Sequence, residues 1–549
     1  MAYINLFILK NKYKKFLRMK RFIYAIALFL IFSVCAKAQR QTDASKKLSL
    51  AAYVISTLYV DDVNEDKLTE DAIRAMLEQL DPHSTYLDPQ EVKDMSASLD
   101  GNFDGVGIQF TMTNDTLYVI QTVAGGPSEK VGILAGDRIV EINDTVVAGV
   151  KMSTKDIMTR LRGKRGTKVD VTVLRKDVPD PIPFRITRDK IPVYSIDASY
   201  MVDKHTGYIR LSRFSATSVQ EFVEAMLKLR RAGMKNLILD LQGNGGGYLN
   251  TAVKIADLLL ADDNALIVYT EGRRSPRTEE KTSSKHLFPD GKLIVLVDEG
   301  SASASEIVSG AIQDWDRGVI VGRRTFGKGL VQRPVPLPDG SMIRLTTARY
   351  YTPSGRSIQK PYTKGEAKAY NEDLINRYNH GELSNADSIH FPDSLKFYTL
   401  KNKRVVYGGG GIMPDYFIPI DTARYTDYHR DIAAKGLINQ EVTSYIDRNR
   451  KELNANYKNV DKFIATFEVD EKMLQDLKSL AEKEKIKYNE EEFQKSLPLI
   501  KAQLKALIAR DLFDMSAYFK IMNQYNDSYQ KALELIGMQE AYEQLLKGK

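Results

Sequence analysis

The feature that most constrains this chain is a repeated order of apolar strand, small-residue turn and helix between residues 236 and 321. Residues 236–241 form an apolar strand pattern, which a glycine run at 243–247 and an amphipathic helix follow. A second apolar run at 293–297 precedes a turn of serines and alanines, another helix and a third run at 319–321. Continuous apolar strands that alternate with helices are typical of buried parallel sheets. The sequence therefore predicts an α/β core.

The remaining segments differ from this core in pattern. Helical spacing, short alternating strands with glycine turns, and charged helical stretches mark separate regions. A stripe of Ile500, Leu504, Leu507 and Ile508 on the last region is expected to pack internally. The predicted regions are a leader at 1–38, an N-terminal helical region at 39–98, a β-rich domain at 99–189, the α/β core at 190–423 with a polar insertion at about 360–404, and a helical C-terminal extension at 424–549.

The first 38 residues have the pattern of a secretory signal peptide. An apolar run at 22–34 follows a basic segment and precedes Ala36-Lys37-Ala38, so we expect cleavage before Gln39. A membrane anchor is the alternative, but the run is shorter than the ~20 residues that span a bilayer. The leader predicts export to the periplasm or cell envelope.

The positive net charge of the chain lies in this leader. Eight of the 79 Lys and Arg residues fall within residues 1–38 with no Asp or Glu, and the other 71 equal the 71 acidic residues. The predicted mature chain is therefore formally neutral, and the main argument for a nucleic-acid partner disappears. The single cysteine, Cys35, also lies in the leader, which excludes a disulfide framework and a cysteine-rich zinc site.

A serine-rich turn follows the apolar run at 293–297. It reads Ser301-Ala302-Ser303-Ala304-Ser305-Glu306 and leads into a helix. Serines at such a position commonly cap the helix, because their hydroxyls accept backbone N–H bonds. A serine there can also be a nucleophile, since a helix N-terminus favours negative charge on a nearby oxyanion. The residues alone leave both interpretations open.

A nucleophilic serine needs a base, and the best candidate is Lys328. It lies in Thr325–Gln332, just after the run at 319–321, whereas the six histidines are scattered. A lysine acts as a general base only when burial lowers its pKa towards neutrality. The flanking glycines are compatible with burial, although a lysine between glycines is also typical of a surface turn.

The glycine run at 243–247 does not fit a phosphate-binding loop. Tyr248 stands at the third glycine of the G-x-G-x-x-G pattern, and no Gly-Lys-Ser/Thr follows. Backbone N–H groups of such a loop can instead form an oxyanion hole.

In combination these segments resemble the C-terminal processing (tail-specific) peptidases, which are serine proteases that contain a PDZ domain. The resemblance covers roughly residues 45–360 and 403–420. The segments that carry it are Leu80–Ser84, Asp240–Gly247, Ser301–Ile307, Thr325–Gln332, Thr346–Arg356 and Gly411–Asp415.

The resemblance implies a crotonase-like protease core with a Ser–Lys dyad. In this sequence Ser303 matches the nucleophile, Lys328 the base, and Gln332 the residue that orients the lysine. The backbone N–H groups of Ala304 and Gly246 match the oxyanion donors. One departure is Gln242, which stands where the family usually has arginine.

Residues 105–137 resemble the PDZ domain of this family. A glycine turn before a strand offers free N–H groups to a terminal carboxylate, and the strand edge can accept an extended peptide as an added strand. The peptide-binding residues that this implies are Gly105, Val106, Gly107, Ile108 and Phe110.

The sequence thus predicts an exported serine endopeptidase that recognises unstructured C-terminal tails of proteins through a PDZ domain. A non-catalytic PDZ scaffold of the cell envelope is the alternative, whereas an acyl-transfer protein lacks a specific motif. We expect no cofactor and no metal. Protein substrates with exposed tails are the expected partners, and an adaptor or a second copy on the helical regions is left open.

Overall fold

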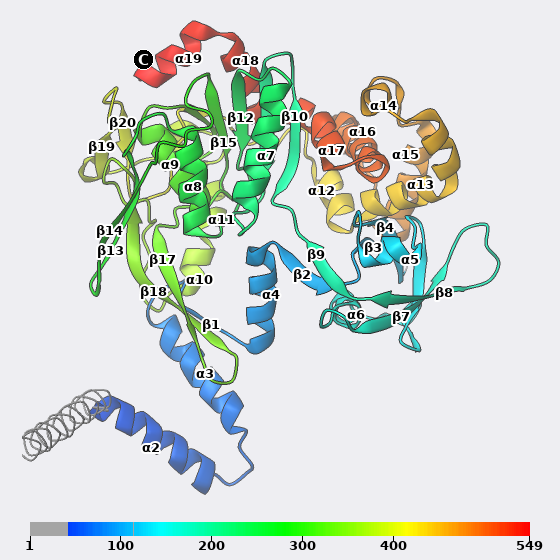
Figure 1. Ribbon diagram of the computed structural model, residues 1–549, viewed down its shortest axis with the longest axis horizontal. Helices are drawn as coiled ribbons and strands as arrows, with labels where there is room; N and C mark the ends of the chain where they lie inside the picture. Colours follow the sequence, from blue (N-terminus) through cyan, green and yellow to red (C-terminus); the bar gives the residue numbers. More distant parts are fainter. Residues whose placement is uncertain (1–41, 114, 549) are drawn as a thin grey trace, which may run out of the picture. The chain divides into compact units, whose positions relative to one another are not determined.

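The computed structural model describes residues 42–113 and 115–548, which form two compact units divided after Leu77 (Figure 1). The first unit contains α2 (Asp43–Leu58) and nearly all of α3 (Glu65–Glu78), which agrees with the predicted N-terminal helical region. The predicted signal peptide lies outside the described residues. Within the described ranges, no helix has the length and apolar character needed to cross a membrane.

The core of the second unit is a six-stranded sheet in the order β10-β11-β12-β15-β16-β21. Its strands after β10 are parallel, and Leu237 pairs with Leu293 in register. The apolar runs of the sequence therefore became buried parallel strands, and the predicted α/β core is confirmed. The strands are β10 (Ile196–Met201), β11 (Thr206–Leu211), β12 (Asn236–Asp240), β15 (Leu293–Val297), β16 (Val319–Gly322) and β21 (Tyr416–Phe417).

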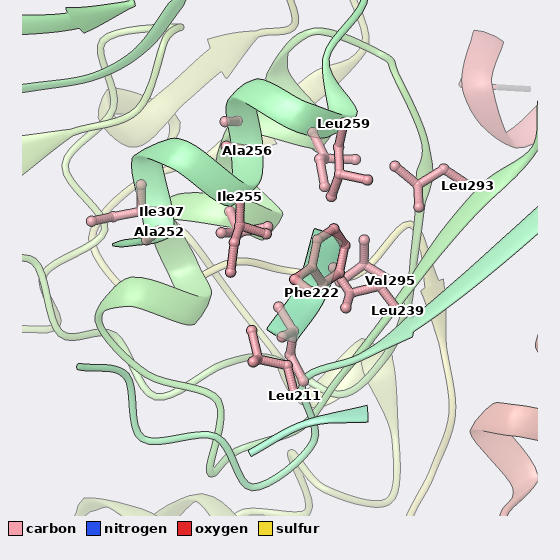
Figure 2. Packing of buried hydrophobic residues seen from close by; sticks show 14 of the residues in the cluster. Leu211, Phe222, Leu239, Ala252, Ile255, Ala256, Leu259, Leu293, Val295 and Ile307 are labelled. Carbon is pink, nitrogen blue, oxygen red and sulfur yellow. The ribbon is translucent and has the colours of Figure 1, made fainter. Parts of the chain in front are cut away.

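Helices α7 (Ser218–Arg231), α8 (Leu249–Leu259) and α9 (Ala304–Asp314) cover one face of this sheet (Figure 2). Alternate strand residues, such as Leu239 and Val295, enter the apolar cluster that these helices close. This follows from the two-residue period of a strand, which sends neighbouring side chains to opposite faces. The cluster fixes the ends of α8 and α9 against the strands from which they emerge.

The opposite face is covered by the last helices of the chain. Ile238, Ile294 and Leu296 pack there in one cluster with Tyr529 and Leu535. These helices are α17 (Met515–Met522), α18 (Asp527–Gly537) and α19 (Gln539–Lys547). Part of the C-terminal extension is therefore a layer of the core itself.

The rest of the extension forms its own helical cluster. The predicted stripe of Ile500, Leu504, Leu507 and Ile508 is buried in it, so its expected packing role is confirmed. The helices of this cluster are α12 (Asp427–Ala434), α13 (Leu437–Asn456), α14 (Val460–Thr466), α15 (Glu471–Lys483) and α16 (Glu490–Leu512).

A second, antiparallel sheet lies beside the core and includes a strand that the sequence did not predict. Residues Thr85–Leu87 form β1, which pairs with β18 (Met342–Tyr351), although 39–98 was expected to be helical. Three residues carry no strand periodicity, and β1 exists only through its distant partner. The other strands are β13 (Leu266–Gly272), β14 (Ser275–Lys281) and β17 (Leu330–Pro336), and α4 (Pro89–Asp100) follows β1.

The β-rich region forms a separate sheet with its own core, in the order β3-β4-β5-β7-β8. β2 (Asn102–Gly105) precedes this sheet in the chain and β9 (Asp189–Pro192) follows it, and the two strands pair with each other in an antiparallel ribbon. Its elements are β3 (Ile108–Thr113), β4 (Thr116–Thr122), α5 (Pro127–Val131), β5 (Arg138–Ile142), β6 (Thr145–Val146), α6 (Thr154–Leu161), β7 (Lys168–Leu174) and β8 (Ile182–Thr187).

The polar insertion at about 360–404 is ordered into short elements. Arg377 is buried and donates hydrogen bonds to the carbonyls of Arg324 and Thr325, just before Lys328. The insertion therefore supports the lysine loop from outside. Its elements are α10 (Ala367–Asn371), α11 (Asp373–Asn379) and β19 (Lys396–Tyr398), which pairs with β20 (Val405–Tyr407).

Candidate active site

The predicted catalytic residues gather at one edge of the central sheet. Gly246 follows β12, Ser303 follows β15 and Lys328 follows β16, and the carboxyl ends of neighbouring parallel strands meet at the same edge. These three residues and Gln332 line one cavity of about 680 Å³. Four residues from three separate segments thus share a single site.

Ser303 occupies the N-cap position of α9 and also lines the cavity. Its backbone has φ 55° and ψ −110°, a left-handed conformation that is costly for a residue with a side chain. Such strain persists only where the surroundings impose it, and it is commonest at functional sites. The turn therefore presents the serine side chain to the cavity at a conformational cost.

Lys328 lies in an environment that suits a lysine acting as a general base. Burial, reinforced by the positive charge of Arg344, lowers the pKa of Lys328 to about 8. Its Nζ makes no hydrogen bond within the part of the chain that the structure describes, and it is not bonded to the Ser303 hydroxyl. Catalytic hydrogen bonds are often long without substrate and tighten in the complex.

Glu306 joins the serine turn to the lysine loop. Its carboxylate accepts hydrogen bonds from the backbone N–H groups of Ser303 (2.7 Å), Gly327 (2.7 Å) and Lys328 (3.0 Å) and from the Thr325 hydroxyl (2.6 Å). Complete burial raises the pKa of Glu306 to about 7, against these four donors. One carboxylate therefore holds the backbones of the predicted nucleophile and base together.

A tyrosine makes a second link between the same two segments. The buried Tyr350 hydroxyl donates towards the Ser303 carbonyl oxygen at 3.1 Å and also contacts the Lys328 carbonyl. The separation of serine and lysine is thus fixed from two sides, by Glu306 and by Tyr350.

Within the described residues Gln332 makes no hydrogen bond to the Lys328 side chain, although both line the cavity. Its amide donates to the Leu330 carbonyl (3.2 Å) and to the Thr346 hydroxyl (3.3 Å). The Thr346 hydroxyl donates in turn to the carboxylate of Asp81 at 2.9 Å. The upstream Asp-Pro-His-Ser turn therefore reaches the site through Thr346 and Gln332.

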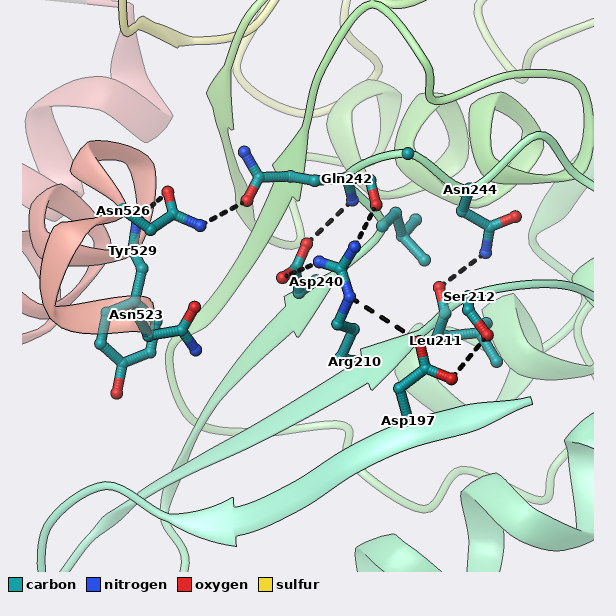
Figure 3. A network of polar contacts seen from close by, with 12 residues as sticks. Asp197, Arg210, Leu211, Ser212, Asp240, Gln242, Asn244, Asn523, Asn526 and Tyr529 are labelled. Carbon is teal, nitrogen blue, oxygen red and sulfur yellow. Dashed lines mark hydrogen bonds and ion pairs between the residues drawn. The ribbon is translucent and has the colours of Figure 1, made fainter. Parts of the chain in front are cut away.

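The glycine loop after β12 is held by buried polar contacts (Figure 3). The Asn244 amide donates to the Leu211 carbonyl at 2.8 Å, and the Asn244 side-chain oxygen accepts from the Gly246 N–H at 2.9 Å. The Ala304 N–H, in the first turn of α9, has no acceptor among the described residues. Ala304 therefore offers a free donor, whereas Gly246 must exchange its hydrogen bond before it can bind an oxyanion.

Gln242, which replaces the arginine usual in the family that the sequence resembles, is held by hydrogen bonds from two sides. The Arg210 guanidinium donates to the Gln242 carbonyl at 2.9 Å and to the buried Asp240 carboxylate at 2.6 Å (Figure 3). On the other side, the Asn526 amide at the start of α18 donates to the Gln242 side chain at 2.8 Å. The last helices of the chain thus contact the base of the glycine loop.

If the Gly246 N–H is an oxyanion donor as predicted, replacing Gly246 with alanine is expected to reduce kcat by about 100-fold, because the added Cβ displaces the loop and this N–H with it. Gly246 has φ +103°, and an added Cβ would lie 2.8 Å from the Ser303 Cβ and 2.9 Å from the Ala302 carbonyl oxygen. The matched control is Gly245→Ala, because a Cβ at that glycine meets no atom within 4 Å. Steady-state kinetics on one peptide compares the two variants, and equal kcat values would contradict the role of Gly246.

The predicted peptide-binding residues surround the start of β3. Gly107 has φ +74°, its carbonyl accepts from Val123 N–H, and the Val106 carbonyl accepts from the N–H and hydroxyl of Ser128. Within the described residues β3 lies at an edge of its sheet. Ile108 and Phe110 lie on β3, whereas Gly105 ends β2, so the five residues form one continuous stretch from the end of β2 into the edge strand β3.

Sequence reasoning gave no role to Glu306, Tyr350, Thr346 or Asp81 in this site. One signal was available for Glu306, because Ser303 and Glu306 have the S-x-x-E spacing in which the glutamate accepts from the N-cap N–H. Tyr350, Thr346 and Asp81 lie far from Ser303 in the chain, and only the pairing of the second sheet brings them near.

Comparison with known families agrees with this arrangement. The model described as Peptidase family S41 matches residues 205–367, and that described as PDZ domain matches 105–182. The Activating protease CtpB N-terminal domain matches 32–91, and a family of unknown function matches 428–514. The predicted multidomain architecture with a PDZ domain and a protease core is confirmed.

Individual relatives give the same assignment. The carboxy-terminal-processing protease of Bartonella bacilliformis is 39% identical over 310 residues, which are 56% of this chain and 70% of that protein. CtpB of Bacillus subtilis, a carboxy-terminal processing protease, is 35% identical over 335 residues, 60% of this chain and 69% of that protein. Among solved structures, the photosystem II D1 C-terminal processing protease is 30% identical, covers 58% of this chain and 90% of its own, and has a TM-score of 0.33. The chain belongs to the carboxy-terminal processing proteases, serine-type peptidases of family S41.

Proposed function

We propose that this chain is an exported endopeptidase in which Ser303 is the nucleophile and Lys328 the general base. The observation that carries the proposal is the shared cavity, in which a strained serine lies near a lysine whose ammonium form is disfavoured by burial. A lysine with a pKa near 8 is partly neutral at physiological pH and can therefore accept a proton. The predicted leader, with its basic segment and apolar run, supports export.

In the proposed reaction, neutral Lys328 takes the hydroxyl proton of Ser303 while Oγ attacks the scissile carbonyl carbon. The N–H groups of Ala304 and Gly246 stabilise the oxyanion of the tetrahedral intermediate. The C–N bond then breaks, the leaving amine takes the proton from Lys328, and an acyl-enzyme remains on Ser303. Water, deprotonated by Lys328, then attacks the ester carbonyl; the bond to the Ser303 oxygen breaks, and Ser303 takes the proton back from Lys328 as the new C-terminal carboxylic acid leaves and ionises.

We propose further that the PDZ domain selects substrates by their exposed C-terminal tails. The support is the open edge of β3 beside the glycine turn at Gly107, which suits an extended peptide with a terminal carboxylate. Gln332 is proposed to orient Lys328 when substrate is bound, because its amide already lines the same cavity.

The function is tested with a folded reporter protein that carries an unstructured C-terminal tail. The purified chain without its leader is expected to shorten this tail, and mass spectrometry of the released peptides locates the cleaved bonds. The same reporter without the tail is expected to stay intact. A Ser303→Ala protein treated in parallel identifies cleavage by contaminants. Binding of the tail without any cleavage by the unaltered chain would instead support the scaffold alternative.

The PDZ role has its own prediction, Gly107→Val. A side chain at Gly107 meets Ile191 at 3.0 Å and Pro127 at 3.2 Å and crowds the loop that is proposed to hold the carboxylate. We expect kcat/KM for the tailed reporter to fall about tenfold or more, while kcat/KM for a short tail-less peptide changes little.

The matched control for Gly107→Val is Gly149→Val. Gly149 has nearly the same φ, +72°, but an added Cβ there meets nothing within 4 Å. Backbone strain is therefore similar in the two variants and only the crowding differs. A parallel loss on tailed and tail-less substrates in Gly107→Val would argue against tail selection by this loop.

A further inference from the structure

The active-site cavity is basic. Among the side chains that line it, Lys328 and Arg344 are the two charged ones and none is acidic. Lys328 must be neutral to act as a base, whereas arginine stays protonated in proteins. The cavity therefore keeps one positive charge, that of Arg344, during the proposed reaction.

Arg344 is half-buried and has no ionic partner in the described chain, unlike several arginines of the protease core. Arg356 pairs with Asp314 at 2.8 Å, Arg404 with Asp316 at 2.7 Å and Arg210 with Asp240 at 2.6 Å. The Arg344 side chain has neither an ion pair nor a hydrogen bond in the described parts of the chain. A half-buried guanidinium without an acceptor carries a desolvation cost that a bound anion would offset.

The position of Arg344 is fixed by the second sheet. It lies on β18, opposite Thr85 of β1 on one side and Pro334 of β17 on the other. A strand between two neighbours is a rigid support, and binding groups on such elements are held more precisely than groups on loops. The guanidinium is thus presented to the cavity by a part of the fold that does not need to rearrange.

We propose that Arg344 forms a carboxylate-binding subsite for the peptide substrate in this cavity. The inference rests on the proposed function, in which the peptide lies beside Ser303. The planar guanidinium can bind a carboxylate through two parallel N–H···O bonds. The carboxylate has two chemical sources, an acidic side chain near the scissile bond or the free C-terminus of a short tail.

This subsite also acts on the base. Arg344 is, after burial, the second cause of the lowered pKa of Lys328, and Glu306 and Asp81 act in the opposite direction. His83 also lies near Lys328, and burial and the lysine charge lower its own pKa to about 4, so it stays neutral. A bound carboxylate that neutralises Arg344 therefore raises the pKa of Lys328, and loss of the Arg344 charge has the same effect.

The test uses one parent peptide that the unaltered chain cleaves. Glutamine is replaced by glutamate at each position around the cleaved bond in turn, and every peptide is made with a free and with an amidated C-terminus. For the unaltered chain, we expect either glutamate at one position or the free C-terminus to raise kcat/KM about tenfold, the usual scale of a charge-assisted hydrogen bond. The first result identifies a side-chain carboxylate and the second a terminal one.

The variants assign this preference to Arg344. Arg344→Gln is expected to abolish it, Arg344→Lys to retain part of it, and Arg344→Glu to favour lysine at the same position. Arg349→Gln is the matched control, because Arg349 lies on the same strand with an exposed side chain and does not line the cavity. In Arg344→Gln, the ascending limb of the pH profile should also move to higher pH, which a merely structural arginine would not cause.

The outcomes separate the two proposals. The subsite proposal is overturned, and the proposed function is left intact, if the unaltered chain cleaves glutamate and glutamine peptides at equal rates and free and amidated peptides at equal rates. A charge preference that persists unchanged in Arg344→Gln overturns it as well. Failure of the unaltered chain to cleave any peptide or tailed reporter overturns the proposed function itself.

Discussion

Substituting alanine for Ser303 is expected to lower kcat/KM for a tailed substrate by about 10⁴-fold or more, as in other serine proteases that lose the nucleophile. The change removes only the hydroxyl. The hydrogen bond from the Ser303 backbone N–H to Glu306, at 2.7 Å, does not involve the side chain and is retained. The folded state and the PDZ domain are therefore expected to be unaffected.

Three measurements on Ser303→Ala check this expectation: kcat/KM, the Kd for a tail peptide and the Tm. Only kcat/KM is expected to change. Ser309→Ala, in the same helix, is the matched control, because its hydroxyl donates at 2.8 Å to a backbone carbonyl within α9 and lines no part of the cavity. Full activity in Ser303→Ala would mean that another residue is the nucleophile.

Replacing Lys328 is expected to have an effect of similar size. Lys328→Ala removes the proposed base, and Lys328→Arg keeps a long basic side chain that stays protonated. Both variants should lose about 10³-fold or more in kcat/KM, in the range that the members of a catalytic dyad contribute. The matched control is Lys360→Arg. Lys360 lies near the lysine loop, and its Nζ pairs with Asp373 at 2.9 Å, so this variant is expected to remain active.

The pH dependence of the unaltered chain tests the same assignment. A base must be neutral, so activity is absent well below the pKa of Lys328 and rises through about 8 as the ammonium loses its proton. Glu306, whose pKa is raised to about 7, ionises just below this range and contributes to the lower part of the limb. The measurement is kcat/KM from about pH 6 to about pH 10, and a profile that is flat over this span would exclude Lys328 as the base.

Much of the fold could be predicted because its signals are local. The apolar runs that became β12 and β15, and the small-residue turns after them, follow from hydrophobic patterning within short windows. Elements that depend on distant partners left no such signal. Strand β1 consists of three residues, and the cover that α18 and α19 give to the second face of the sheet cannot be read from helical periodicity alone.

The candidate site divides in the same way. Ser303 and Lys328 lie in compact motifs, so the resemblance to a known family could assign them, although their residues alone left other interpretations open. Glu306 and Tyr350 act through backbone groups of other segments, and their contacts depend on how the strands pair and how the loops close. Gln332 was expected to orient the lysine, but its amide N–H groups donate to the Leu330 carbonyl and to the Thr346 hydroxyl on the paired strand β18.

The two faces of the central sheet are covered by helices from different parts of the chain. The second face can therefore be covered only after the last helices have been synthesised. While the chain is being made, the strands and α7 to α9 exist long before α18 and α19, so Ile238, Ile294 and Leu296 remain without their cover. The same late helix brings Asn526 to Gln242 at the base of the glycine loop. A nascent or truncated chain lacks this contact at the base of the glycine loop, and its proteolytic activity is expected to appear only once synthesis has reached the final helices.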